Sequence, residues 1–130
     1  MGIGYKEGVL RDEFMRLDLH NPLLWAIIQE FAAFSETMFD VDIIITSIFR
    51  PVPESSVHAH WRGVDCRSWI YSEEQIELIR LYFDSRWQYD PIRPEISTVI
   101  YHEVDNGGLH LHFQSHSRTM AVDRADFQQN

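Results

Sequence analysis

The chain has 130 residues, which is the size of one domain and enough for a hydrophobic core without disulfides. Hydrophobic residues make up 45% and charged residues 24%, which excludes a disordered chain, and no apolar run approaches the roughly 18 residues that span a bilayer. Eleven basic residues against twenty acidic ones give a net charge of −9, so nucleic acid is a poor partner. The single cysteine, Cys66, excludes a disulfide framework and a Cys-rich zinc site, and we expect it to be buried.

We expect one monomeric domain over residues 1–130, with a core at about 21–116 and a polar, loosely ordered tail at 117–130. The first residues lack the apolar stretch of a secretory signal, so we expect the protein to be cytoplasmic as synthesised.

Residues 1–20 are mixed and predict no clear element. Asn21 is a good N-cap and Pro22 suits a first helical position, and apolar residues at helical spacing then extend a predicted helix to about Phe39. Residues 42–50 are β-branched and apolar, which predicts a buried strand.

Residues 51–64 are loop-like, and the capping box formed by Ser72 and Gln75 then predicts a helix over 73–87. Two strands, 98–104 and 109–114, flank a four-residue turn that contains Asn-Gly, a strong hairpin signal. These elements predict an α+β fold with a small, mostly antiparallel sheet and helices packed on one face.

The expected hairpin register pairs Glu103 with His110 and Tyr101 with His112. One face would then carry the polar residues Glu103, His110, His112 and Gln114. In this register His102 falls on the apolar face, as a core or edge histidine. A slip of one residue would exchange the faces of one strand.

A second cluster contains His58, His60 and Asp65, whose nitrogen and oxygen atoms are suitable zinc ligands. Two ligands from here and one from the hairpin would leave the fourth position of a zinc ion open, which is the catalytic pattern. A histidine-rich surface loop is the alternative interpretation.

Three segments together resemble a known family: residues 46–50 (TSIFR), 56–58 (SVH) and 62–65 (RGVD). They resemble the pattern T-S-x-[FY]-R…S-x-H-x6-D of the zinc D-alanyl-D-alanine carboxypeptidase and dipeptidase family. The same core occurs in phage peptidoglycan endopeptidases and in the hedgehog signalling domain. Glu103 with residues 110–114 (HLHFQ) resembles the last motif of the family, so the resemblance covers about residues 42–115.

The resemblance implies the fold of this family and one zinc ion per chain, with the ligands His58, Asp65 and His112. It implies that Glu103 is the general base, that Arg50 steadies the substrate carbonyl and the oxyanion, and that His110 acts near the metal. Arg50 could instead pair with an acid to hold the loop.

The sequence departs from the family pattern at two places. Trp61 stands where the family often has a glycine, and His60 beside it is a rival ligand. Glu103 lies nine residues before His112, farther than is usual, and Asp105 is the fallback base. We expect Ser56, His60 and Trp61 to contact the substrate.

The leading prediction is therefore a zinc metallopeptidase that hydrolyses peptide bonds in bacterial cell-wall peptides and reaches the wall by a phage-type release route. Which peptide bond it cuts is open, and neither nucleic acid nor a membrane is expected as a partner. One alternative is an inactive zinc-binding domain of the same fold that acts through interactions. Another is a cupin-like β-barrel with ligands from the two His-x-His pairs, which the predicted helices disfavour.

Overall fold

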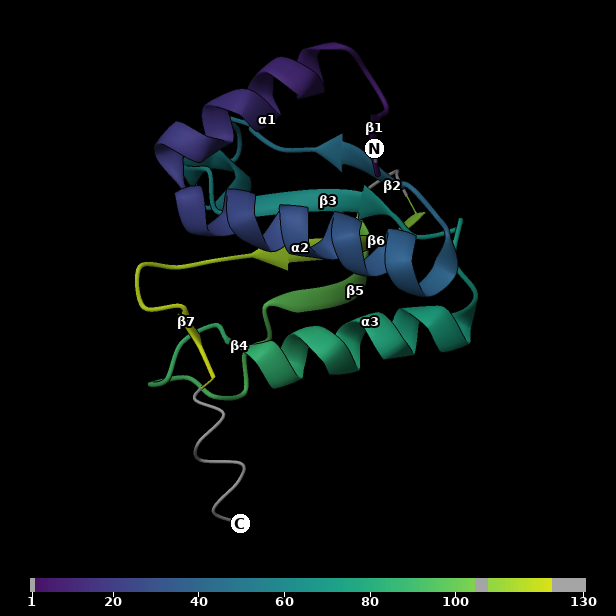
Figure 1. Ribbon diagram of the computed structural model, residues 1–130. Helices are drawn as coiled ribbons and strands as arrows, with labels where there is room; N and C mark the ends of the chain where they lie inside the picture. Colours follow the sequence, from purple (N-terminus) through teal and green to yellow (C-terminus); the bar gives the residue numbers. More distant parts are fainter. Residues whose placement is uncertain (1, 105–107, 123–130) are drawn as a thin grey trace.

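The computed structural model describes residues 2–104 and 108–122, except for the side chains of Glu103 and Val104. The fold is α+β (Figure 1), with the helices α1 (Val9–His20), α2 (Pro22–Phe39) and α3 (Glu73–Arg86). Within the described residues, five strands form one sheet in the spatial order β1 (Ile3–Tyr5), β2 (Ile43–Ser47), β3 (Gly63–Arg67), β6 (Gly108–Gln114) and β5 (Val99–Val104).

The sheet is antiparallel except for the parallel pair β1 and β2. A second, two-stranded sheet pairs β4 (Trp87–Gln88) with β7 (Met120–Ala121), and a short 3-10 helix, η1 (Val57–His60), precedes β3. Among the described residues, no helix is both long and apolar enough to cross a membrane.

The two predicted helices form where the sequence places them. The side chain of Asn21 accepts a hydrogen bond from the backbone N–H of Leu24 and so caps α2, which ends at Asp40 in the left-handed conformation. Ser72 and Gln75 form the expected reciprocal capping box at the start of α3.

The core was expected to begin at about residue 21, but α1 and β1 precede this residue and belong to the fold. Leu10, Phe14 and Leu17 of α1 are buried. These three residues have the i, i+4, i+7 spacing of an amphipathic helix, so the sequence did carry a signal for α1. Strand β1 is three residues long, and its pairing with β2 is a long-range contact that no local pattern announces.

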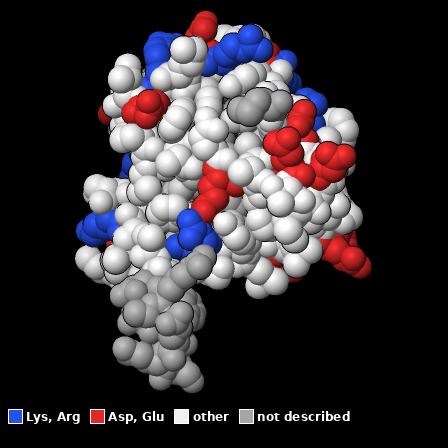
Figure 2. Space-filling view, viewed as in Figure 1, with Lys and Arg blue, Asp and Glu red and all other residues white. Residues whose placement is uncertain are grey.

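Helices α2 and α3 cover one face of the sheet. Phe113 of β6 packs against Phe31 of α2 and Phe83 of α3, with ring centroids 4.5 and 5.4 Å apart. Val64 and the expected buried thiol, Cys66, extend this core along β3. Seen from the side of these helices, the surface is largely uncharged, and its Lys and Arg side chains form small separate groups (Figure 2).

The hairpin of β5 and β6 has a different register from the expected one. Glu103 pairs with Leu109, not with His110, and Ile100 rather than Tyr101 pairs with His112. The strand β6 starts one residue early because Gly108 adopts a φ of 73°, a left-handed conformation that glycine takes without strain. His102 consequently pairs with His110, on the same face as His112, so its predicted place on the apolar face is wrong.

Part of the predicted loose tail is held against the domain. The guanidinium of Arg118 bonds the buried carboxylate of Asp90 at 2.8 Å, and β7 pairs with β4. Residues 123–130 and the predicted turn residue Asp105 lie outside the described residues.

Candidate metal centre

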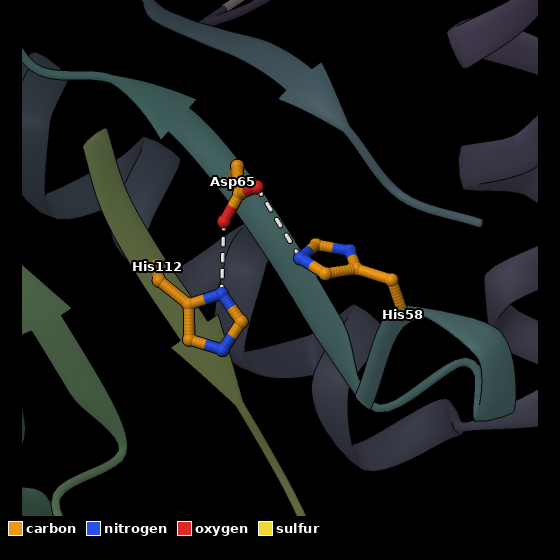
Figure 3. A group of neighbouring side chains, drawn as sticks. All are labelled: His58, Asp65 and His112. Atoms are coloured by element: carbon orange, nitrogen blue, oxygen red, sulfur yellow. Dashed lines mark hydrogen bonds and ion pairs between the residues drawn. The ribbon is translucent and has the colours of Figure 1, made fainter. Parts of the chain in front are cut away.

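Three predicted ligands come together on the sheet face opposite α2 and α3. His58 comes from η1, Asp65 from β3 and His112 from β6, and one candidate ligand atom of each lies within 4.8 Å of the others. Both histidine rings point at the carboxylate of Asp65 (Figure 3). The three residues are 2%, 2% and 5% exposed. This buried group could hold a metal ion.

The orientation of His58 leaves one nitrogen for a ligand. Its Nδ1 donates a hydrogen bond to the carbonyl oxygen of Ile48 at 2.8 Å, so Nε2 of the neutral ring carries a lone pair. This Nε2 is buried and lies 3.2 Å from Oδ2 of Asp65, within ion-pair distance but without the geometry of a hydrogen bond. Two electron-rich atoms so placed fit a cation between them.

A hydrogen bond to Gln114 orients the ring of His112, as the bond to Ile48 orients the ring of His58. Its Nδ1 lies 2.8 Å from Oδ1 of Asp65, and its Nε2 lies 3.2 Å from Oε1 of Gln114. The amide nitrogen of Gln114 donates to the carbonyl oxygen of Ser97, which keeps Oε1 directed at the ring. Because Oε1 only accepts, Nε2–H of His112 donates to it and Nδ1 is left for a metal.

The carboxyl of Asp65 is ionised at neutral pH. Burial by itself would raise its pKa, but the rings of His112 and His58, when the nitrogens that face the carboxylate carry a proton, hold the pKa well below its usual range. The cluster therefore presents one anionic oxygen ligand and two imidazole nitrogens.

Gly63 allows the two histidine rings to approach each other. A Cβ at this position would lie 2.7 Å from Cγ2 of Val57 and 2.8 Å from Cε1 of His112. It would also lie 3.3 Å from Cε1 of His58. The absence of a side chain at residue 63 is thus part of the site, a role that the sequence did not reveal.

Arg50 stands at the edge of the cluster. Its Nη2 lies 3.6 Å from Oδ2 of Asp65, and its side chain is 48% exposed. The guanidinium thus contacts both a candidate ligand and solvent. This position is compatible with both sequence interpretations of Arg50, an acid-pairing residue and a group that meets the substrate.

The residues around the first ligand shape its loop. Ser56 caps η1 by accepting a hydrogen bond from the backbone N–H of His58. Trp61 follows with a φ of 58°, in the region that glycine prefers, at the position where the resembled family often has glycine. Its ring stacks between Phe49 and His20, with centroids 4.7 and 4.3 Å away.

Two other predicted histidines lie apart from the three candidate ligands. His60 is exposed, and its Nε2 donates to the carbonyl oxygen of Glu54 at 2.7 Å. His110 lies on the same sheet face as His112 but nearer the hairpin turn, and its Nδ1 is 3.1 Å from the carbonyl oxygen of Gly108. The side chain of Glu103, the predicted base, lies outside the described part of the structure.

His102 is the residue near the site that the sequence interpretation missed. Its ring centroid lies 5.2 Å from that of His112, and its Nε2 is buried and has no hydrogen-bond partner among the described residues. Burial and the neighbouring His112 lower the pKa of His102, which favours the neutral ring. A hairpin register shifted by one residue from the expected one would have predicted His102 on the same face as His112.

Comparisons of the chain with protein-family models, with curated proteins and with solved structures found no match in any of the three.

Proposed function

We propose that the protein is a zinc metallopeptidase that hydrolyses peptide bonds in bacterial cell-wall peptides. The observation that carries this proposal is the convergence of His58, Asp65 and His112, in which hydrogen bonds to Ile48 and Gln114 leave the ring nitrogens that face Asp65 available to a metal. Two imidazole nitrogens and a carboxylate are zinc ligands, and three protein ligands leave one position for water or substrate. When bound, zinc acts as a Lewis acid and lowers the pKa of water towards neutrality.

Arg50 is the group that we assign to the developing negative charge. Its half-exposed guanidinium lies beside the cluster and presents several donors to an anionic oxygen. Its present contact, 3.6 Å from Oδ2 of Asp65, is too long for a strong hydrogen bond, so the side chain can turn to a substrate at little cost.

Two adjacent residues of β5 are candidates for accepting the proton of the attacking water. Glu103 is the candidate from the sequence resemblance, and because its backbone pairs with Leu109 it occupies a position of β5 that alternates with the face of His112. His102 is the candidate from the fold, because its ring lies beside His112 and its Nε2 has no hydrogen-bond partner in the part of the chain that the structure describes. Replacing each in turn, as Glu103→Gln and His102→Gln, identifies the base as the residue whose loss stops hydrolysis while the zinc content stays the same.

The support for a cell-wall peptide as substrate is the resemblance of the three motifs that contain Arg50, His58 and Asp65. The test uses two groups of substrates, peptides that end in D-Ala-D-Ala and peptides that contain an L-Ala–D-Glu bond. Hydrolysis of one group and not the other would assign the bond.

The first experiment measures metal content in protein purified without chelator. We expect one zinc per chain in the wild type, none in His112→Ala, and one in the matched control His110→Ala, which changes a histidine of the same face of β6. No stoichiometric metal in the wild type, or equal metal in both variants, contradicts the ligand assignment and the enzyme proposal with it.

One observation favours a second candidate function, a zinc-binding domain without catalysis. The three ligand side chains are nearly inaccessible to solvent, so a peptide reaches them only if surrounding residues move. Stoichiometric zinc with no hydrolysis of either substrate group would support this candidate over the peptidase.

A further inference from the structure

A polar cavity lies away from the metal centre, where the end of α1, the start of α2 and the segment after β6 meet. Its volume is about 350 Å³. Four of the residues that line it carry basic side chains, namely His20, His60, Arg62 and His116. Among the described residues that line it, none is acidic, although acidic residues outnumber Lys and Arg by twenty to eleven in the whole chain.

The charges around this cavity are predominantly positive. The guanidiniums of Arg62, Arg93 and Arg118 and the carboxylate of Asp90 lie near enough to His116 to influence its pKa. The carboxylate of Asp90 already bonds both Arg93 and Arg118, at 2.8 Å each. Within the described part of the chain, Arg62 has no carboxylate partner. Its charge is therefore available to a ligand.

The neutral side chains of the cavity add hydrogen-bond donors. Nδ1 of His116 accepts the backbone N–H of Arg118, so Nε2 of the neutral ring carries its proton. Ser115 is 1% exposed, and its hydroxyl oxygen accepts a hydrogen bond from Asn21. The hydroxyl proton of Ser115 has no acceptor in residues 2–104 and 108–122, so a buried donor at the cavity is left for a ligand. The first turn of α2 adds its positive end.

We propose that this cavity binds the phosphate group of a small phosphomonoester. Guanidinium, imidazole N–H and hydroxyl donors that meet from several directions suit a tetrahedral oxyanion with three acceptor oxygens. The cavity is at the lower end of the range for small-molecule sites and is larger than one phosphate requires, so the phosphate belongs to a larger molecule. The site is independent of the proposed peptidase function.

Backbone amide NMR spectra of the full-length protein, titrated with glycerol 3-phosphate, inorganic phosphate and acetate, test this proposal. We expect saturable shifts confined to residues 20–23, 60–62 and 115–117. Glycerol 3-phosphate should bind more tightly than inorganic phosphate, and acetate more weakly than either. The same shifts are expected in chelator-treated protein, since no metal ligand lines the cavity.

Arg62→Gln is expected to weaken binding of glycerol 3-phosphate by roughly tenfold or more, the effect of losing one charge-assisted hydrogen bond. Arg80→Gln removes an arginine of α3 that does not line the cavity and should leave binding unchanged. Ser115→Ala is a second test variant, and thermal unfolding establishes that each variant is folded. Chemical shift changes that do not saturate, or that spread over the surface, would overturn the proposal. It would also be overturned if acetate bound as tightly as phosphate, or if Arg62→Gln and Ser115→Ala both bound glycerol 3-phosphate with unchanged affinity.

Discussion

Asp65 and His112 lie directly opposite each other on the neighbouring strands β3 and β6, with Oδ1 and Nδ1 2.8 Å apart. The register of the central sheet thus holds two of the three candidate metal ligands, while His58 is held by its hydrogen bond to Ile48. Because the site exists only when these strands are paired, metal affinity and folding stability are linked.

Removing the metal should therefore destabilise the protein. At a free zinc concentration about 100 times the dissociation constant, binding contributes about 2.7 kcal/mol to the free energy of unfolding. We expect the midpoint of thermal unfolding to fall when a chelator is added and to recover with zinc, as measured by circular dichroism. His112→Ala should show no zinc-dependent change, and an equal response in that variant would contradict the assigned ligands.

Gly63→Ala should weaken both the site and the fold. The added Cβ would meet Cγ2 of Val57 and Cε1 of His112 at less than 3 Å, so both side chains or the backbone of residue 63 must move. We expect a loss of about 1–3 kcal/mol in the free energy of unfolding, the usual cost of overpacking, and weaker zinc binding by competition with a chromogenic chelator. Gly8→Ala is the matched control, because a Cβ there meets nothing within 4 Å. Equal effects of the two substitutions would count against this role of Gly63.

Gln114→Leu should lower zinc affinity by roughly 10–100-fold, because Nε2–H of His112 loses the acceptor that orients the ring. Gln114→Glu keeps an acceptor at this place and should retain most of the affinity. Isothermal titration with zinc measures both variants. If the leucine variant binds zinc as the wild type does, Gln114 does not orient the ligand.

Arg50→Met should lower the rate of peptide hydrolysis without lowering the affinity for zinc. The substitution removes a cation that lies 3.6 Å from Oδ2 of Asp65, so zinc should bind as tightly as before or more tightly. The rate of peptide hydrolysis should fall by roughly 100-fold if Arg50 stabilises the oxyanion. Arg80→Met, on the surface of α3, is the control for both measurements. A parallel loss of zinc would show instead that Arg50 holds the loop.

The buried carboxylate of Asp90 should make stability depend on pH in the acid range. Burial by itself would raise its pKa, but hydrogen bonds from Arg93 and Arg118 hold the pKa well below its usual range. Its stabilising contribution is therefore complete above the unfolded-state pKa of about 4 and is lost as the pH falls from there towards the lower folded-state value. In urea unfolding between pH 7 and pH 2, Asp90→Asn should be less stable at neutral pH and less sensitive to acid. Parallel curves for the two proteins would contradict this assignment.

Local sequence signals identified the helices α2 and α3 and the strands β2, β5 and β6, whereas α1, β1, β4, β7 and the strand β3, which begins within the predicted loop 51–64, were not predicted. Asn21 with Pro22, and Ser72 with Gln75, are start signals that act within one turn, and both helices begin where these residues predict. The resemblance of the sequence motifs also implied the candidate ligands His58, Asp65 and His112, whereas residue type and spacing alone left His60 as an alternative to His58. Alternation along β6 correctly separated the face of His110 and His112 from that of Leu111 and Phe113.

Only the tertiary structure decided how β5 lies against β6. The sequence allows a turn of three residues, 105–107, or of four residues, 105–108, and the choice between them exchanges the faces of β5 without changing any local pattern. The observed register of β5 and β6 places His102 beside His112 and pairs Glu103 with Leu109. The parallel pairing of β1 with β2, the space at Gly63 and the positive cavity beside Arg62 likewise join segments that are distant in the chain. Local propensity acts over a few residues, whereas these features depend on which distant segments pack together.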